Sequence, residues 1–154
     1  MSGVAYWVWK AKNQRAVEID FRSKKVGDVK VLKSYKDLIV YQKGYNLALD
    51  VYRITKDYPQ DERFGLISQM RRSAVSIPIN IAEGYRRNSI NEYIQFVHIA
   101  YGSCGELETL ISLSRDLEFI DKDRFTKLYE LQEEVSKLLN GLIKSLSNPK
   151  RRKM

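Results

Sequence analysis

The sequence predicts an all-α protein, an antiparallel up-down four-helix bundle with a poorly defined N-terminal arm. Three observations support this fold class. From Tyr35 onward, apolar residues recur every three to four positions, which is the spacing of one helix face. The pattern divides into four segments of about 20 to 28 residues, within the usual range for bundle helices. Only a few residues separate consecutive segments, and short connections favour antiparallel neighbours.

The first two predicted helices, 36–57 and 61–86, are separated by the stretch "YPQD". The first ends there because Pro59 disfavours helical geometry at Tyr58. Pro78 lies inside the second helix, where it removes a backbone hydrogen bond and predicts a kink. We expect this kink to curve the helix around its core rather than to act as a hinge.

The third and fourth predicted helices, 89–117 and 121–147, each begin at a capping signal. In "SINE", Ser89 and Glu92 predict a capping box, in which the two side chains satisfy free backbone N–H groups. Asp121 in "DKDRF" is the predicted N-cap of the fourth helix. The stretch "NPKRRK" then ends that helix.

The basic residues are concentrated at the two ends of the chain, which carries a formal net charge of +8. Residues 1–34, a basic N-terminal arm or extension, carry net +5. The predicted bundle, 35–147, carries net −1, and the basic C-terminal tail, 148–154, carries net +4. Short apolar pieces of the arm are compatible with strands, but their spacing by Lys, Arg, Ser and Gly favours a loosely ordered segment. The overall basic charge is therefore weak evidence for nucleic-acid binding by the bundle itself.

No membrane span or exported form is expected. The chain has no run of about 18 apolar residues, and "VAYWVW" near the N-terminus is too short for the apolar core of a signal peptide. Cys104 is the only cysteine, so an internal disulfide is impossible. These features indicate a cytoplasmic protein.

The sequence offers no catalytic or metal-binding motif. His98 is the only histidine, and one histidine with one cysteine does not make a usual zinc site. A lone histidine in the middle of a helix is more often a hydrogen-bonded structural residue. No Glu-x-x-His motif or Gly-rich phosphate loop is present. We therefore expect a non-enzymatic protein with no catalytic residue, no metal ligand and no cofactor.

The second predicted helix carries two neighbouring apolar stripes. The first stripe consists of Leu66, Met70, Ala74, Ile77, Ile81 and Tyr85. The second consists of Ile67, Val75, Pro78 and Ala82. A bundle helix normally hides about a third of its circumference, so two stripes indicate a helix covered on more than one side. This helix is either central in the bundle or also faces another subunit.

Small residues in the third predicted helix, in "YGSCGE", indicate a second place of close contact. Gly102 and Gly105 are poor helix formers that let another helix backbone approach. Their expected partner is the small-residue end of the second helix, "NIAEG", and the competing interpretation is a local break in the third helix. The candidates for an oligomer interface or close packing are Val75, Pro78, Ala82, Gly102 and Gly105.

Two arginine pairs, Arg71 with Arg72 and Arg86 with Arg87, are the candidate nucleic-acid-binding residues. They lie fifteen positions apart on one predicted helix, or about 22 Å along its axis, and broadly on one side. The planar guanidinium group suits phosphate because it forms paired hydrogen bonds. The second pair is the stronger candidate because it lies at the end of the helix.

Pairing within the fold is the alternative interpretation of these charges. Arg71 and Arg72 have possible acidic partners in the fourth helix, at Glu130, Glu133 and Glu134. Glu83 lies among apolar residues, and if it is buried it needs an ion pair or a hydrogen bond, for instance to a tyrosine.

Several motifs together carry a family resemblance. They are "FGL" at 64–66, "Q-x-RR" at 69–72, "SI-x-x-NIAEG" at 76–84 and "GS-x-x-ELET" at 102–109. With these motifs, residues 35–146 resemble the bacterial four-helix-bundle proteins known as 23S ribosomal RNA intervening-sequence proteins. The resemblance implies an antiparallel bundle that assembles into a ring, typically a pentamer. A similar bundle is the accessory protein of diversity-generating retroelements, where a basic pentamer is thought to bind nucleic acid and reverse transcriptase.

Two functional hypotheses follow from the residues and the resemblance together. The first is a non-enzymatic homo-oligomer that binds RNA or another nucleic acid through its arginine-rich patches. The second is a structural or adaptor ring that recruits a protein client without direct nucleic-acid binding. The intervening-sequence family itself implies no agreed biochemical activity.

Overall fold

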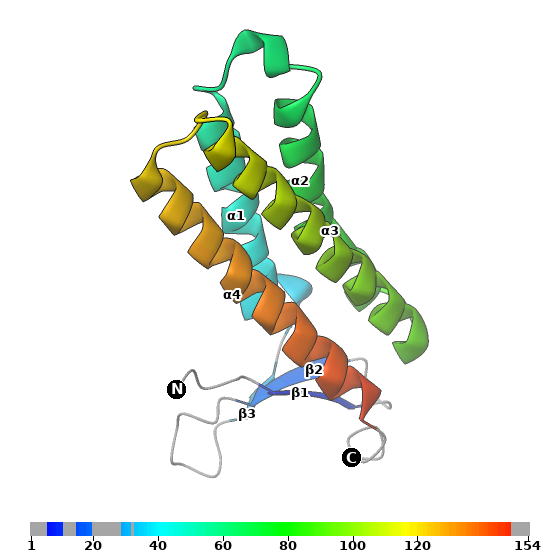
Figure 1. The fold of residues 1–154 in the computed structure, drawn as a ribbon. Helices are drawn as coiled ribbons and strands as arrows, with labels where there is room; N and C mark the ends of the chain where they lie inside the picture. The colour runs from blue at the N-terminus through cyan, green and yellow to red at the C-terminus, as the bar shows by residue number, and fades with distance from the viewer. Residues whose placement is uncertain (1–5, 11–14, 20–28, 32, 149–154) are drawn as a thin grey trace.

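The computed structural model describes residues 6–10, 15–19, 29–31 and 33–148. Residues 33–148 form four long helices, which Figure 1 shows side by side. These helices are α1 (Ile39–Thr55), α2 (Leu66–Tyr85), α3 (Ile90–Asp116) and α4 (Lys122–Ser147). Each helix packs on the next in the chain, and α4 also packs on α1, which closes the bundle. The predicted all-α four-helix fold is confirmed.

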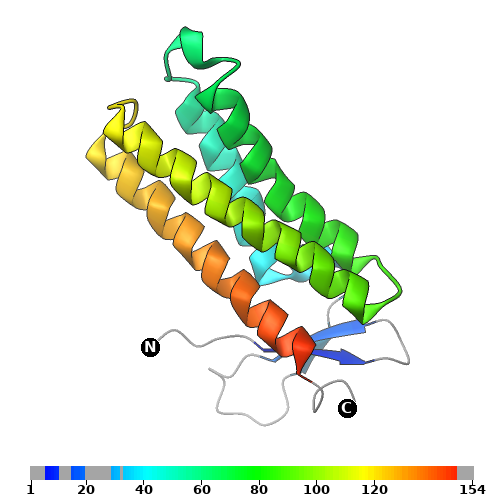
Figure 2. The ribbon, with the colours of Figure 1, turned by 45° about the vertical axis from the view of Figure 1, so that its right-hand side comes forward.

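The three apolar pieces of the N-terminal segment form short strands. They are β1 (Tyr6–Lys10), β2 (Arg15–Ile19) and β3 (Val29–Val31). They pair as an antiparallel sheet in the order β1-β2-β3, with Val17 opposite both Val8 and Val31. The sheet lies at the end of the bundle where α4 ends, with β1 against α4 (Figure 2). The other residues of the predicted arm, and 149–154 of the predicted basic tail, lie outside the described residues.

Helix α2 begins at Leu66, later than the predicted residue 61. Residues Gln60–Glu62 instead form a short 3-10 turn, η2. Gly65 then adopts a non-helical backbone with φ −104° and ψ −113°, and Glu62 Oε2 accepts the free N–H of Leu66 at 2.9 Å. Glu62 thus caps α2 from the connection before the helix, whereas the sequence predicted it within the first helical turn.

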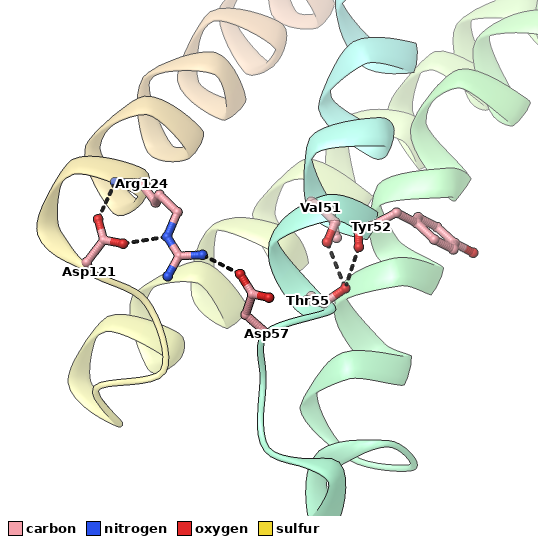
Figure 3. A network of polar contacts seen from close by, with 6 residues as sticks. All are labelled: Val51, Tyr52, Thr55, Asp57, Asp121 and Arg124. Carbon is pink, nitrogen blue, oxygen red and sulfur yellow. Dashed lines mark hydrogen bonds and ion pairs between the residues drawn. The ribbon is translucent and has the colours of Figure 1, made fainter.

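The capping prediction is wrong for α3 and confirmed for α4. Ser89 occupies the N-cap position of α3, but its side chain makes no capping hydrogen bond. Asp121 accepts the backbone N–H of Arg124 at 2.9 Å. Arg124 also pairs through its side chain with Asp121 and, at 2.8 Å, with Asp57 beyond the end of α1 (Figure 3). This network joins the start of α4 to the α1–η2 connection.

The core consists of fully buried side chains from all four helices, since each helix turns one face inward. The largest apolar members are Leu38, Val40, Leu47, Met70, Ile77, Ile81, Leu107, Ile111, Leu139 and Leu142. Gln132 is buried among them, and its Nε2 donates to the carbonyl oxygen of Cys104 at 3.1 Å, so α4 is also joined to α3 by a polar contact. Among the described residues, no helix is long and apolar enough to cross a membrane.

The close approach of α2 and α3 occurs at Gly84 rather than at Gly102 and Gly105. A Cβ atom placed on Gly84 would lie 2.7 Å from Cβ of Phe96 and 2.9 Å from Cδ2 of Tyr93. Among the described residues, a Cβ placed on Gly102 or Gly105 would have no atom within 4 Å apart from those of its chain neighbours and of the surrounding turns of the α3 backbone. Helix α3 runs through both glycines, which excludes the competing interpretation of a local break. The expected close contact of these glycines with "NIAEG" is wrong, because no other element among the described residues lies close to them. Their role in an oligomer interface stays a prediction.

Candidate nucleic-acid interface

A surface pocket with three arginines extends along α2 from the connection that precedes it to Asn80, and Tyr52 of α1 borders it. We call it the arginine pocket, and its volume is about 670 Å³. It is lined by Tyr52, Arg63, Phe64, Ile67, Ser68, Arg71, Arg72, Val75, Ser76, Ile79 and Asn80. No aspartate or glutamate lines it. Glu62 precedes Arg63 in the sequence, but its carboxylate accepts the backbone N–H of Leu66 and does not line the pocket.

Arg71 is held in this pocket by two neutral groups from α1. Its Nε donates to Oγ1 of Thr55 at 2.9 Å, and its guanidinium carbon lies 4.7 Å from the centre of the Tyr52 ring. Thr55 is itself fixed, because its hydroxyl donates to the carbonyl oxygen of Val51 at 2.7 Å (Figure 3). The guanidinium group of Arg71 is therefore oriented by neutral groups, and no carboxylate within residues 33–148 neutralises it. Its terminal nitrogens can donate hydrogen bonds to an anion.

Arg63, Phe64 and Arg72 complete the charged and aromatic part of the pocket. Phe64 is 88% exposed, and the guanidinium carbon of Arg63 lies 5.5 Å from the centre of its ring. Arg72 is exposed, and its Nη2 donates to Oε1 of Gln69 at 2.9 Å. All three arginines thus have neutral partners, and within residues 33–148 none of them forms an ion pair.

The second predicted arginine pair has different surroundings, at the opposite end of α2. Arg87 forms an ion pair with Glu83 at 2.6 Å, and its guanidinium carbon lies 4.7 Å from the centre of the Phe96 ring. The guanidinium carbon of Arg86 lies 5.5 Å from the centre of the Tyr35 ring. Both arginines are exposed, as expected for the end of a helix. The structure does not bring the two pairs into one pocket.

The acidic residues also differ from the sequence-based alternatives. Glu83 does form an ion pair, but it is exposed rather than buried. In the fourth helix, Glu134 pairs with Lys43 at 2.9 Å and Glu133 with Lys137 at 3.7 Å. Pairing of Arg71 or Arg72 with these glutamates is therefore not observed within the described part of the chain.

Next to the arginine pocket lies an apolar groove between α1 and α2, which we call the tyrosine groove. It has a volume of about 470 Å³ and is lined by Tyr35, Tyr41, Tyr45, Ala48, Leu49, Tyr52, Val75, Pro78, Ile79 and Ala82. The predicted contact residues Val75, Pro78 and Ala82 all line it. Tyr45 and Ile79 are 50% and 54% exposed, so part of this apolar face is uncovered in the single chain.

The single cysteine and the single histidine of the chain, Cys104 and His98, lie in different surroundings. Burial, and to a lesser extent the charge of Glu108, raises the pKa of the Cys104 thiol to about 12. The thiol is therefore protonated at neutral pH and is a poor nucleophile. His98 is exposed on α3 rather than held in the core. Among the described residues, no group of three His, Cys, Asp or Glu side chains is placed to hold a metal ion.

Sequence reasoning missed three of the residues that give the arginine pocket its charge and aromatic character. Arg63 and Phe64 were hidden inside a predicted helix that the structure begins only at Leu66. Tyr52 was assigned only to the apolar pattern of the first helix, although its ring also supports Arg71. The adjacent "RF" before α2 was the available signal, because surfaces that bind single-stranded nucleic acid combine basic side chains with aromatic rings.

All the residues that line the arginine pocket, and all but Tyr35 of those that line the tyrosine groove, lie in the part of the chain that matches a known family. Residues 36–141 match the 23S rRNA-intervening sequence protein family. The chain belongs to this family. The match runs from η1 (Tyr35–Asp37) into α4 and leaves out the three strands, so the bundle is the intervening-sequence protein domain.

A solved structure agrees with this assignment. The chain is similar to a protein of unknown function from the S23 ribosomal protein family of Bacteroides thetaiotaomicron, with 27% sequence identity and a TM-score of 0.65. The similarity covers 71% of this chain and 98% of the other. No curated protein matches the chain. The match to the intervening-sequence family and the similarity to this structure thus agree on the fold.

Proposed function

We propose that this intervening-sequence family member is a non-enzymatic nucleic-acid-binding protein whose arginine pocket contacts phosphate groups. RNA is the class of nucleic acid that the family's description suggests. The observation that carries the proposal is the presence of three arginines around one pocket whose lining contains no acidic side chain. Because a guanidinium fork matches two phosphate oxygens, such a cluster suits a polyanion.

The pre-ordering of Arg71 strengthens this proposal. Thr55 and Tyr52 hold its guanidinium group before any ligand arrives. A side chain that is already ordered loses less conformational entropy on binding. The local arrangement matters here because the bundle, 35–147, is close to neutral overall. The basic ends of the chain, with net +5 and net +4, add attraction that is independent of nucleic-acid sequence.

A salt series on the full chain tests this function. We expect the double variant Arg71→Gln, Arg72→Gln to weaken binding to a labelled RNA and to make the slope of log affinity against log salt shallower by about 1.4, or 0.7 for each lost phosphate contact. Fluorescence anisotropy at several salt concentrations measures both quantities. The matched control is Arg53→Gln, Arg115→Gln, which removes two exposed arginines that pair with Asp50 and Asp116 outside the pocket. Equal losses in the two double variants would show that only net charge matters.

A structural or adaptor ring is the second candidate, and the tyrosine groove favours it. An exposed apolar face of this kind is typical of a surface that another protein covers. In this proposal the groove joins copies of the chain into a homo-oligomer, a pentamer by family resemblance, and the ring presents a further surface to a protein client. A ring would also repeat the arginine pocket once per subunit, so weak phosphate contacts would reinforce one another.

The assembly state of the chain tests whether it forms a ring. We expect light scattering of the full chain to show an oligomer, and Leu49→Glu, which places a charge in the groove, to dissociate it. Leu113→Glu is the control, since Leu113 is 45% exposed on α3 and lies outside the groove. A monomeric parent protein would contradict the ring.

A cytoplasmic location is the remaining part of the proposal. Cys104 is the only cysteine in the sequence, and its thiol is buried. A fold that depends on no disulfide is suited to a reducing compartment, where thiols stay reduced. Nucleic acid and ribosomal RNA processing are also found there in bacteria.

A further inference from the structure

The exposure of Phe64 is not a result of fraying. This side chain is 88% exposed, more than any other large apolar side chain within residues 33–148. The connection that carries it is fixed by backbone hydrogen bonds from Arg63 N to Gln60 O at 3.0 Å and from Gly65 N to Glu62 O at 3.1 Å. A ring that is ordered and almost fully exposed is available to stack against a ligand, and burial of its apolar surface would then favour binding.

The neighbours of Phe64 define the chemistry of that ligand. One face of the ring is occupied by the guanidinium of Arg63, and the pocket adds Arg71 and Arg72. The Tyr52 ring, which is 43% exposed, likewise has a guanidinium on one face. Flat aromatic surfaces among cationic groups suit a ligand with both a planar apolar part and an anionic part, and a nucleotide has both.

Polar side chains line the same pocket and suit the edge of a base or a ribose. They are Ser68, Ser76 and Asn80. Asn80 is oriented by Ser76, because its Nδ2 donates to the Ser76 carbonyl oxygen at 2.7 Å and to Oγ at 3.0 Å. Its own carbonyl oxygen then serves as an acceptor. The pocket volume of about 670 Å³ lies within the usual range of small-ligand sites, so one nucleotide unit fits.

Single-stranded and double-stranded RNA differ in which of these groups they would use. A duplex keeps its bases stacked inside and presents phosphates and 2′-hydroxyls, so it would contact the arginines but not the Phe64 ring. A single strand offers unstacked bases together with its phosphates, so it would use both.

We propose that the arginine pocket binds single-stranded RNA, with an unpaired base stacked on Phe64 and the adjoining phosphates held by Arg71 and Arg72. This inference rests on the proposed nucleic-acid-binding function and narrows it to unpaired segments. It also assigns Phe64 and Asn80 to the binding site, the first as a stacking surface and the second as a hydrogen-bonding group.

The test measures how tightly the full-length parent protein and one full-length variant bind two RNA probes. The probes are a labelled oligouridine of about 12 nucleotides, which falls within known single-strand site sizes, and an RNA duplex of the same length. We expect the parent protein to prefer the single strand. Phe64→Leu should weaken binding to the single strand about tenfold, because base stacking on an aromatic ring is lost. Its affinity for the duplex and its salt slope should stay unchanged, because no phosphate contact is removed.

Tyr101→Leu is the matched control, since Tyr101 is an aromatic residue that is 40% exposed on α3 and lies outside the pocket. We expect it to bind both probes like the parent. Thermal unfolding checks that Phe64→Leu is folded, which its exposure predicts. If the duplex binds as tightly as the single strand and Phe64→Leu has no effect while the Arg71→Gln, Arg72→Gln variant is impaired, the single-strand inference is overturned and the proposed function stands. If neither probe binds the parent protein, both are overturned.

Discussion

The two ends of α2 carry the same Arg-Arg sequence but present it in different ways. At the N-terminal end, Arg71 and Arg72 are bonded to neutral groups and share a pocket with Arg63. At the C-terminal end, Arg87 is paired with Glu83, one helical turn earlier. The residues one turn before Arg71 and Arg72 are uncharged, so no such pairing occurs there. The availability of an arginine for phosphate therefore depends on its neighbours one turn away as much as on its exposure.

The two ends also differ in packing. Gly84 leaves no room between α2 and α3, so the C-terminal end is a tightly packed joint. The N-terminal end has an almost fully exposed Phe64 in the connection that precedes it. We interpret the C-terminal end of α2 as mainly structural. In the proposed function, the N-terminal end of α2 is the ligand-binding surface.

The largest expected effect concerns the joint at Gly84. Gly84→Ala should lower the free energy of unfolding by about 1–3 kcal/mol, because the new methyl group overlaps Phe96 and Tyr93 and the helices have to separate. Gly102→Ala is the matched control, with open space around the new methyl group, and should raise stability by up to about 1 kcal/mol through helix propensity. Urea denaturation of both variants measures the difference. Equal effects of the two substitutions would contradict the assignment of the tight contact.

The next effect compares the two arginine pairs directly. We expect Arg71→Gln, Arg72→Gln to weaken RNA binding by about tenfold or more, the usual cost of losing hydrogen bonds to a charged group. Arg86→Gln, Arg87→Gln should cost about threefold at most, because Glu83 already engages Arg87, and Arg86 lies against the Tyr35 ring outside the arginine pocket, so that only long-range charge is lost. Anisotropy titrations at one salt concentration rank the pairs. A larger loss at Arg86 and Arg87 would move the binding surface to the other end of α2.

The smallest effect comes from releasing Arg87. Glu83→Gln should raise RNA affinity about twofold, because it frees the guanidinium and removes a repulsive charge. Stability should fall by only about 0.3–0.5 kcal/mol, the value of an exposed helical ion pair one turn apart. Glu106→Gln, which removes an exposed acidic residue on α3, controls for the change in net charge. A large loss of stability with no gain in affinity would indicate that Glu83 acts only in the fold.

The error over the small residues of α3 shows what sequence reasoning overlooked. Helices α2 and α3 run antiparallel from a short connection, so residues equally far from that connection face each other. Gly84 therefore meets Tyr93 and Phe96, whereas Ser103 meets Ser76, with their hydroxyl oxygens 2.8 Å apart. The expected contact of "NIAEG" with "YGSCGE" is incompatible with this register. The composition suggested close packing correctly at Gly84, but the choice of partner required the alignment of two helices.

The sequence by itself determined the four helices, their order and their buried faces, because apolar periodicity and short connections are local properties of the chain. It singled out Glu83 as a residue that needs a partner if buried, whereas the structure shows Glu83 exposed and paired with Arg87, one turn further along the chain. Only the tertiary structure decided which arginines share a pocket. Arg71 is oriented by Tyr52 and Thr55 from another helix, and Arg63 joins it because α2 begins at Leu66. Contacts between helices depend on how their axes and registers align, and residue spacing along one helix does not specify that alignment.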